Sequence, residues 1–86
     1  MTYRIEVTPA ARRDLAKLPQ DVLRRVDAHL FALAENPYPA GAKKLQGSEG
    51  FFRVRVGDYR IIYLVERHRL VVLVVRVRHR REIYRG

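Results

Sequence analysis

The stretch 51-FFRVRVGDYRIIYLVERHRLVVLVVRVRHRREIYRG-86 sets arginines at two-residue spacing into segments that are otherwise apolar. Side chains alternate between the two faces of a β-strand, so the valines of FRVRV can enter a core while Arg53 and Arg55 project together from the opposite side. Arg76 and Arg78 repeat this spacing. The stretch therefore predicts a sheet with one apolar face and one arginine-rich face.

The positive charge of the chain is concentrated in the same stretch. From Phe51 onward there are ten arginines and three acidic residues, which account for +7 of the formal net charge of +9. Fifteen of the basic residues are arginine and three are lysine, whereas a merely solvated surface more often mixes Lys with Glu. Each guanidinium stays charged and can grip a phosphate through two nitrogens. A polyanion, RNA or DNA, is the predicted partner, and a plain solvated face is the alternative.

The alternating patterns predict four strands and two helices. A Thr-Pro pair at positions 8 and 9 reads as a helix start, and this helix stops before Pro19; a second helix opens at Gln20 or Asp21 and ends at Asn36. The predicted strands are 3–7, 51–56, 59–65 and 70–76, with a II′ hairpin turn at Gly57-Asp58. The expected order is β-α-α-β-β-β, an α+β fold with two helices packed on one face of a mostly antiparallel four-stranded sheet.

Length and composition narrow the remaining possibilities. We expect one domain over residues 1–86, with a surface loop over 37–50 that carries Lys43 and Lys44. The chain has no cysteine, so it has neither a disulfide framework nor a thiolate metal site. The N-terminus lacks a signal-peptide pattern and the run 70–75 is too short to cross a bilayer, which predicts a cytoplasmic protein with no membrane partner.

Four motifs together carry a family resemblance. They are YRIEVTPAARRDLAKLP at 3–19, KKLQG at 43–47, FRVRVGDYRIIY at 52–63 and VRHRREIY at 77–84. In this order they resemble the RelE family of bacterial toxins, within the RelE/ParE superfamily of type II toxin–antitoxin systems. The first motif alone is common, whereas the hairpin followed at this distance by HRREIY is specific.

The resemblance implies a RelE-like fold and an enzyme that acts in the ribosomal A site. A toxin of this family cuts mRNA by attack of a ribose 2′-hydroxyl on the adjacent phosphate, which leaves a 2′,3′-cyclic phosphate and a 5′-hydroxyl. It needs no metal and no other cofactor. Its partners are the ribosome, mRNA and a cognate antitoxin, with which it forms a hetero-oligomer. The exposed cationic face predicts an antitoxin segment that is acidic and partly disordered before it binds.

The family's functional residues carry over to specific positions. They fall on Arg53 and Arg55 in the first hairpin strand, Arg60 after the turn, Arg80 or Arg81 near the C-terminus, and Tyr84. Two features depart from the family pattern. The best-studied members have lysines at the two hairpin positions, and the spacing between the C-terminal arginine and tyrosine is tighter here, which leaves the choice between Arg80 and Arg81 open.

This cleavage chemistry requires a base, an acid and positive charge on the phosphorane-like transition state. Arginine can supply the charge at Arg53, Arg60 and the C-terminal position, but its pKa above about 12 makes it a poor proton carrier. The candidates for proton transfer are His79 and Tyr84; the alternatives are a phosphate contact for the histidine and base stacking for the tyrosine. The residues predicted to bind RNA without taking part in the reaction are Lys43, Lys44, Arg55, Arg76 and Arg78.

Two other functions remain open at this point. The superfamily also contains ParE-type toxins that inhibit DNA gyrase and need no RNA-cutting site. A basic face with aromatic residues would equally suit an RNA-binding module that blocks without cutting. The ends of the RNA products would separate these possibilities.

Overall fold

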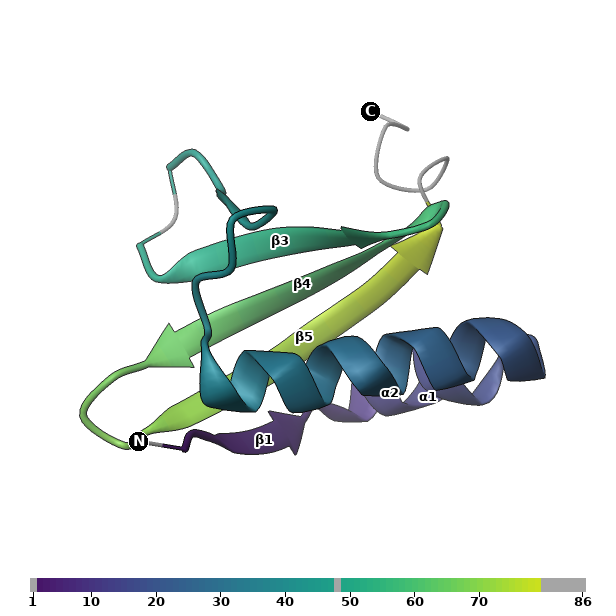
Figure 1. The fold of residues 1–86 in the computed structure, drawn as a ribbon, viewed down its shortest axis with the longest axis horizontal. Helices are drawn as coiled ribbons and strands as arrows, with labels where there is room; N and C mark the ends of the chain where they lie inside the picture. Colours follow the sequence, from purple (N-terminus) through teal and green to yellow (C-terminus); the bar gives the residue numbers. More distant parts are fainter. Residues whose placement is uncertain (1, 48, 80–86) are drawn as a thin grey trace.

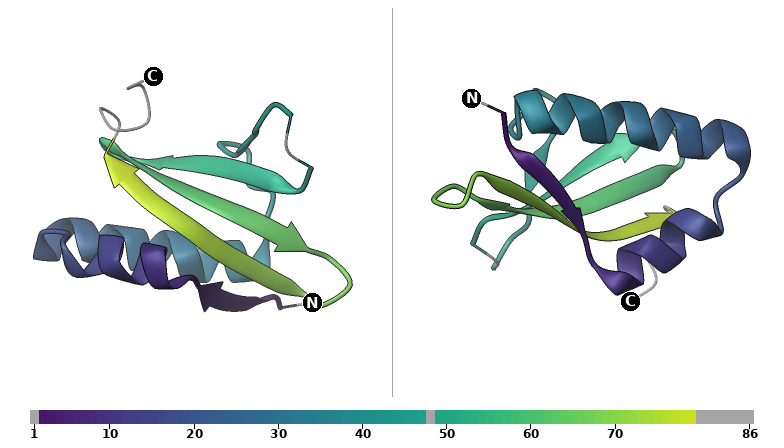
Figure 2. Two further views of the ribbon diagram at one scale, coloured as in Figure 1. Left: turned by 180° about the vertical axis from the view of Figure 1, so that it is seen from behind. Right: turned by 90° about the horizontal axis from the view of Figure 1, so that it is seen from below.

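Five strands and two helices make up the part of the chain that the computed structural model describes, residues 2–47 and 49–79. The elements are β1 (Arg4–Val7), α1 (Pro9–Ala16), α2 (Gln20–Glu35), β2 (Lys43–Lys44), β3 (Phe51–Val56), β4 (Tyr59–Glu66) and β5 (Val71–His79). Both helices lie below the sheet in Figure 1 and therefore on the same face of it, as the view from below in Figure 2 also shows. The opposite face, which we call the open face, is covered by neither helix.

The strands form one sheet in the order β1-β5-β4-β3-β2. Strand β1 pairs in parallel with β5, and the other neighbours are antiparallel. The predicted α+β class, the element order and the helices on one face are confirmed. The predicted strand number of four is too low, because Lys43–Lys44 pairs with β3 as a fifth strand at the edge. Two residues are too short a segment to show an alternating pattern, so the sequence predicts this segment as loop.

The two helices begin next to structural signals that the sequence carries. The Thr8 side chain accepts a hydrogen bond from the Ala11 backbone N–H and donates one to the Val75 carbonyl, which fixes the start of α1 against β5. Helix α2 starts directly after Pro19 and buries a stripe of apolar residues against the sheet. Within the described residues, neither helix is long and apolar enough to span a bilayer.

The core lies between the helices and the sheet. Its buried members on β3, β4 and β5 are Val54, Val56, Ile61, Tyr63, Val65, Val72, Val74 and Val77. Tyr63 is fully buried and its hydroxyl donates to the Pro37 carbonyl at 2.8 Å, which ties the segment after α2 to the middle of the sheet. Burial, followed by the charge of Tyr38, raises the pKa of Tyr63 to about 12. This residue is therefore a structural group and stays protonated at neutral pH.

The turn between β3 and β4 is the tight connection that the Gly-Asp pair predicts. Gly57 has a φ of 60°, and Asp58 has no positive φ, as a II′ turn requires. A Cβ at Gly57 would also lie 3.1 Å from Arg25 Nη2 on α2. Glycine is therefore favoured here by the backbone conformation, since the guanidinium at the end of the exposed Arg25 side chain can shift to admit a Cβ.

Candidate nucleic-acid interface

Three arginines from three neighbouring strands lie in one cross-strand row on the open face. Arg55 of β3 is paired with Arg60 of β4, and Arg60 is paired with Arg78 of β5. Neighbouring strands are about 4.8 Å apart, so the three side chains leave the sheet side by side. We call this set the arginine row. In the next row along the sheet, Arg53 lies opposite both Ile62 and Lys43.

Four cations of these two rows, but not Arg78, border a small pocket. The pocket has a volume of about 150 Å³ and is lined by Gly41, Lys43, Arg53, Arg55 and Arg60. We call it the arginine pocket. Its size suits a phosphate group and is too small to enclose a nucleotide, whose binding sites generally need several hundred Å³. Gly41, in the predicted loop, lines the pocket as well, and no sequence motif marks it.

The electrostatics of the arginine row favour an anionic ligand. Like charges placed directly opposite each other on a sheet are destabilising by roughly 0.2–1 kcal/mol per pair. Arg55 Nε donates to the Gly57 carbonyl at 2.9 Å, and Arg60 Nη1 to the Tyr59 carbonyl at 3.4 Å. These contacts orient the guanidinium groups without neutralising them, and no ion pair among the described residues engages Arg53, Arg55 or Arg60. A bound phosphate would relieve the repulsion.

A β-bulge directs Arg76 and Arg78 onto the open face. Against β4, Tyr63 pairs with Val74 and Ile62 pairs with Arg76, so Val75 is the extra residue of β5. Before the bulge, Val74 points into the core; without the bulge, Arg76 and Arg78 would share its face. The place of Arg78 in the arginine row therefore depends on this irregularity in β5.

Arg76 is bound to an acidic residue of α1. Arg76 Nε and Nη2 donate to the two carboxylate oxygens of Asp14 at 2.8 and 3.1 Å, and the Val77 backbone N–H donates to Asp14 at 3.0 Å. Because the backbone N–H of Val77 lies in the plane of the sheet, Asp14 meets β5 at its edge, where the Arg76 side chain reaches it from the open face. Asp14 thus holds α1 against the part of β5 that follows the bulge. The sequence predicts RNA binding for Arg76 and no role for Asp14, since the two residues are 62 positions apart and only the fold brings them together.

Asp14 gives the protein a measurable dependence of stability on acid pH. Burial alone raises the pKa of Asp14, but the hydrogen bonds from Arg76 and Val77, with the charges of Arg76 and Arg78, outweigh it and hold the pKa below 3.8. Because the folded-state pKa is lowered, the stabilisation is complete above the unfolded-state pKa near 3.8 and is lost as the pH falls through the lower folded-state value. We expect Asp14→Ala to reduce the free energy of unfolding at pH 7 by about 2–3 kcal/mol. Denaturant unfolding at a series of pH values measures both effects.

The matched variant for this prediction is Asp14→Asn, which removes the charge and keeps an oxygen that can accept from Val77. Its unfolding free energy should lie between those of the parent and Asp14→Ala at pH 7. The gap between the parent and Asp14→Asn should narrow in acid as the parent carboxylate is protonated. A gap that stays constant down to pH 2 contradicts a lowered pKa at Asp14.

His79 lies on a different face from the arginine row. It is paired with Tyr59 across β4 and β5, and the two rings meet edge to face with centroids 5.2 Å apart. Tyr59 alternates with Arg60, and its face is that of Ile61 and the core. His79 is predicted from the sequence to act in the reaction with Arg53 and Arg60, whereas the fold separates it from them by the thickness of the sheet.

The two lysines predicted to bind RNA lie on opposite faces of the sheet. Lys43 is paired with Arg53 and lines the arginine pocket. Lys44 is paired with Phe52, on the opposite face, and borders a hollow of about 310 Å³ along the following loop with Leu45 and Glu49. The predicted residues Arg80, Arg81 and Tyr84 lie outside the described residues. Of the site predicted from the sequence, the fold brings together Arg53, Arg55, Arg60, Arg78 and Lys43.

Comparisons with known proteins agree on a family. Residues 5–84 match the family model described as the ParE toxin of the type II toxin–antitoxin system parDE. Toxin RelG from Mycobacterium tuberculosis is 37% identical over 86 residues, covering 99% of this chain and 99% of its own length.

Solved structures give the same result at the level of the fold. The toxin–antitoxin complex RelBE2 from M. tuberculosis contains a chain that is 35% identical, with a TM-score of 0.80, over 92% of this chain and 99% of that one. The archaeal RelE–RelB complex from Pyrococcus horikoshii contains one that is 30% identical, with a TM-score of 0.83, over the full length of both. With a matching family model over most of its length and relatives that are at least 30% identical, this chain belongs to the RelE/ParE superfamily and is a RelE-family toxin of a type II toxin–antitoxin system.

Proposed function

We propose that this toxin is a ribosome-dependent endoribonuclease that cuts mRNA in the A site by attack of a ribose 2′-hydroxyl on the neighbouring phosphate. The observation that carries the proposal is the arginine pocket, where Arg53, Arg55 and Arg60 converge on a volume the size of a phosphate. A ParE-like inhibitor has no need of such a site.

The arginine pocket suits the charge that develops during this reaction. As the 2′-oxygen attacks, the non-bridging oxygens of the phosphate gain negative charge, and guanidinium groups already aimed at them stabilise the transition state without reorganisation. We assign Arg53 and Arg60 to these oxygens, together with Arg80 or Arg81. We assign Arg55, Arg78 and Lys43 to the phosphate backbone of the mRNA on either side.

The small size of the arginine pocket supports a requirement for the ribosome. A pocket of about 150 Å³ can hold a phosphate but cannot bend the RNA so that the 2′-oxygen, the phosphorus and the leaving 5′-oxygen are in line. Correct alignment of reacting groups contributes a large part of the rate enhancement of enzymes. In this proposal the ribosome fixes the mRNA, and the toxin supplies charge and proton transfer.

A comparison of naked and ribosome-bound mRNA tests the proposal. With the purified toxin, we expect cleavage only of mRNA in programmed ribosomes, with 2′,3′-cyclic phosphate and 5′-hydroxyl product ends. Equal cleavage of naked mRNA would remove the ribosome from the mechanism. Intact mRNA with stalled ribosomes would identify a blocking RNA-binding module.

One finding favours a second candidate function. The family model that matches residues 5–84 is described as the ParE toxin. Toxins of the ParE type inhibit DNA gyrase. Gyrase poisoning by the purified toxin with mRNA left intact would establish this alternative. Relatives of this chain named RelG and RelE favour the ribonuclease.

We also infer an antitoxin partner of complementary charge. The related chains from M. tuberculosis and P. horikoshii are in complexes of toxin with antitoxin, and the net charge of +9 favours an acidic segment that folds as it binds. This segment would lie across the helices and the arginine row in a hetero-oligomer. Suppressed cleavage in a complex that leaves Arg53 and Arg60 accessible would contradict masking of the site.

The two adjacent lysines of β2 provide a matched test of the open face. Lys43→Ala should lower the affinity for programmed ribosomes by about tenfold, since it removes one charge-assisted phosphate contact from the arginine pocket. Lys44→Ala removes the same charge one residue away, on the opposite face, and should cost less than about threefold. Equal losses for the two variants would mean that only the net charge of the segment counts.

A further inference from the structure

The turn between β4 and β5 contains a leucine where the backbone favours glycine. Leu70 has a φ of 53°, the only positive value of a non-glycine residue in the described part of the chain. This left-handed conformation is sterically costly for a bulky side chain, whereas glycine or asparagine adopts it readily. Two hydrogen bonds hold it in place, from Leu70 N–H to the Arg67 carbonyl at 3.3 Å and from Arg4 N–H to the Leu70 carbonyl at 2.7 Å. An observed backbone strain of this kind is a reason to search the turn for a function.

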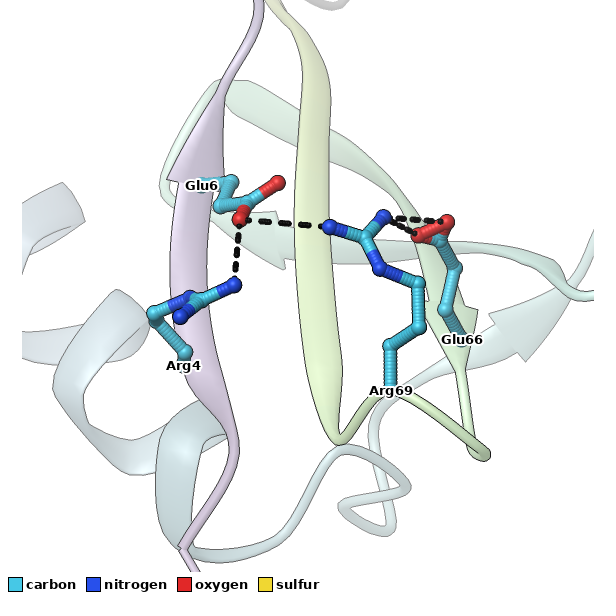
Figure 3. Close-up of polar contacts among 4 residues, drawn as sticks. All are labelled: Arg4, Glu6, Glu66 and Arg69. Carbon is cyan, nitrogen blue, oxygen red and sulfur yellow. Dashed lines mark hydrogen bonds and ion pairs between the residues drawn. The ribbon is translucent and has the colours of Figure 1, made fainter.

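An ion-pair cluster fixes the frame of the turn. Figure 3 shows Arg69 reaching across β5, from Glu66 on β4 at 2.6 Å to Glu6 on β1 at 3.6 Å, and Arg4 joins Glu6 at 3.0 Å. Val71, whose partners across the strands are Arg4 and Glu66, is fully buried on this face. The cluster therefore links the turn to β1 and β4 and partly offsets the charge of Arg69 and Arg4.

The turn carries a hollow that the ion-pair cluster does not fill. It has a volume of about 540 Å³ and is lined by Tyr3, Arg67, His68 and Leu70. We call it the turn site. No ion pair among the described residues engages Arg67 or His68, and both side chains are exposed. The turn site thus combines an aromatic ring and an aliphatic wall with one permanent cation and one imidazole.

We propose that the turn site binds an unpaired nucleotide of RNA, with the base against Tyr3 and Leu70 and a phosphate at Arg67 and His68. Stacking of a splayed-out base on an apolar or aromatic side chain, next to a cation, is a common way for proteins to bind unpaired RNA. The volume falls in the range of small-molecule sites, unlike that of the arginine pocket. In this proposal the leucine at the strained position supplies the apolar wall for the base.

The turn site and the arginine row lie at opposite ends of β4. In Figure 1 the turn between β3 and β4 marks the end with the arginine row, and the turn between β4 and β5 marks the turn site. Strand β4 has eight residues and is therefore roughly 26 Å long. One toxin molecule could hold the scissile phosphate at one end and a second RNA segment, as ribosomal RNA would provide, at the other. This inference rests on the proposed action on the ribosome, but the binding of RNA at the turn site can be measured without it.

The test uses binding alone, in the full chain with Arg53→Ala and Arg60→Ala as the parent. The probes are a single-stranded RNA hexamer and a ribose-phosphate oligomer of the same length without bases. Adding Arg67→Ala should lower the affinity for the hexamer by about tenfold or more, and should reduce the slope of log K against log salt by about 1. Arg24→Ala, an exposed arginine on α2, removes the same charge and should change neither.

Leu70→Asn tests the base-binding wall. Asparagine tolerates the left-handed backbone, so the turn is preserved while the apolar wall is lost. The preference of the parent for the hexamer over the abasic oligomer should fall by about fivefold or more, as expected for the loss of one stacked base. Should Leu70→Asn fold poorly in thermal unfolding, the comparison of Arg67→Ala with Arg24→Ala decides the question.

Equal losses of affinity in Arg67→Ala and Arg24→Ala would overturn the proposal, since only general charge would then be at work. Equal affinity of the parent for the hexamer and the abasic oligomer would also overturn it. Because no ribosome is present, a toxin that binds the hexamer at the turn site but leaves mRNA intact contradicts the proposed cleavage only. A toxin that cleaves mRNA but fails the binding test contradicts the turn site only.

Discussion

Arg60→Ala is expected to lower the single-turnover rate of mRNA cleavage on the ribosome by about 10²–10³-fold, the usual effect of removing one donor from a site for developing negative charge. Arg60 is the central member of the arginine row, between Arg55 and Arg78, and it also lines the arginine pocket. A group that stabilises the transition state more than the ground state accelerates the reaction without a matching gain in binding. The affinity of the variant for ribosomes should therefore fall by less than about tenfold.

The measurement separates binding from chemistry. Cleavage is followed at saturating concentrations of ribosome-bound mRNA, so that the rate reports the chemical step. The affinity for ribosomes is measured separately, under conditions in which the toxin does not cleave. Arg24→Ala is the control, because it removes an equal charge from an exposed position of α2 and should leave both quantities near those of the parent. Equal losses of rate and affinity in Arg60→Ala would reduce its role to uniform binding of the RNA backbone.

Local patterns in the sequence predict the larger part of the fold. The strand over 51–56 and the Gly-Asp turn are observed where the sequence predicts them, because alternation and turn chemistry depend on neighbours in the chain. The hairpin also places Arg53 and Arg55 on the face opposite Val54, as expected. Strand β2 is not predicted, since its two residues are paired only because β3 offers a free edge.

The C-terminal strand shows where local patterns fail. The run Val71–Val75 is apolar throughout and gives no indication of which residues face the core. The bulge at Val75 decides it, by turning Arg76 and Arg78 to the open face and His79 to the other. Two hydrogen bonds flank the bulge: Thr8 donates to the Val75 carbonyl, and the Val77 N–H donates to Asp14. Thr8 and Asp14 are each more than 60 positions from their partners in β5. Contacts of this kind cannot be read from spacing along the chain.

The position of His79 changes the assignment of proton transfer. The base and the acid must each reach the 2′-hydroxyl or the leaving 5′-oxygen within hydrogen-bonding distance of a phosphate held by the arginines. His79 lies on the same face of the sheet as Tyr59 and the core. Arginine holds its proton too tightly to act as the acid or the base. Of the two candidates from the sequence, Tyr84 is therefore the one that we assign to proton transfer, in a segment outside the described residues.

Tyr84→Phe should lower the single-turnover rate on the ribosome by about 10²-fold or more, as expected when a positioned acid or base is removed. The substitution keeps the ring, so any stacking on an mRNA base is preserved while the hydroxyl is lost. Tyr84→Ala should be no more than slightly slower than Tyr84→Phe, because the hydroxyl carries the effect. His79→Gln should retain most of the rate, since it changes a side chain on the other face of the sheet.

The opposite pattern would move the chemistry elsewhere. A nearly normal rate in Tyr84→Phe together with a large loss in Tyr84→Ala would mean that the ring only stacks. If His79→Gln then lost about 10²-fold, proton transfer would belong to His79, and β5 would have to twist beyond its bulge to bring the imidazole to the arginine row. If both Tyr84→Phe and His79→Gln kept the parent rate, the acid and the base would have to come from the ribosome. The toxin would then contribute only the positive charge of Arg53, Arg60 and their neighbours, and Arg60→Ala would remain the single substitution with a large effect.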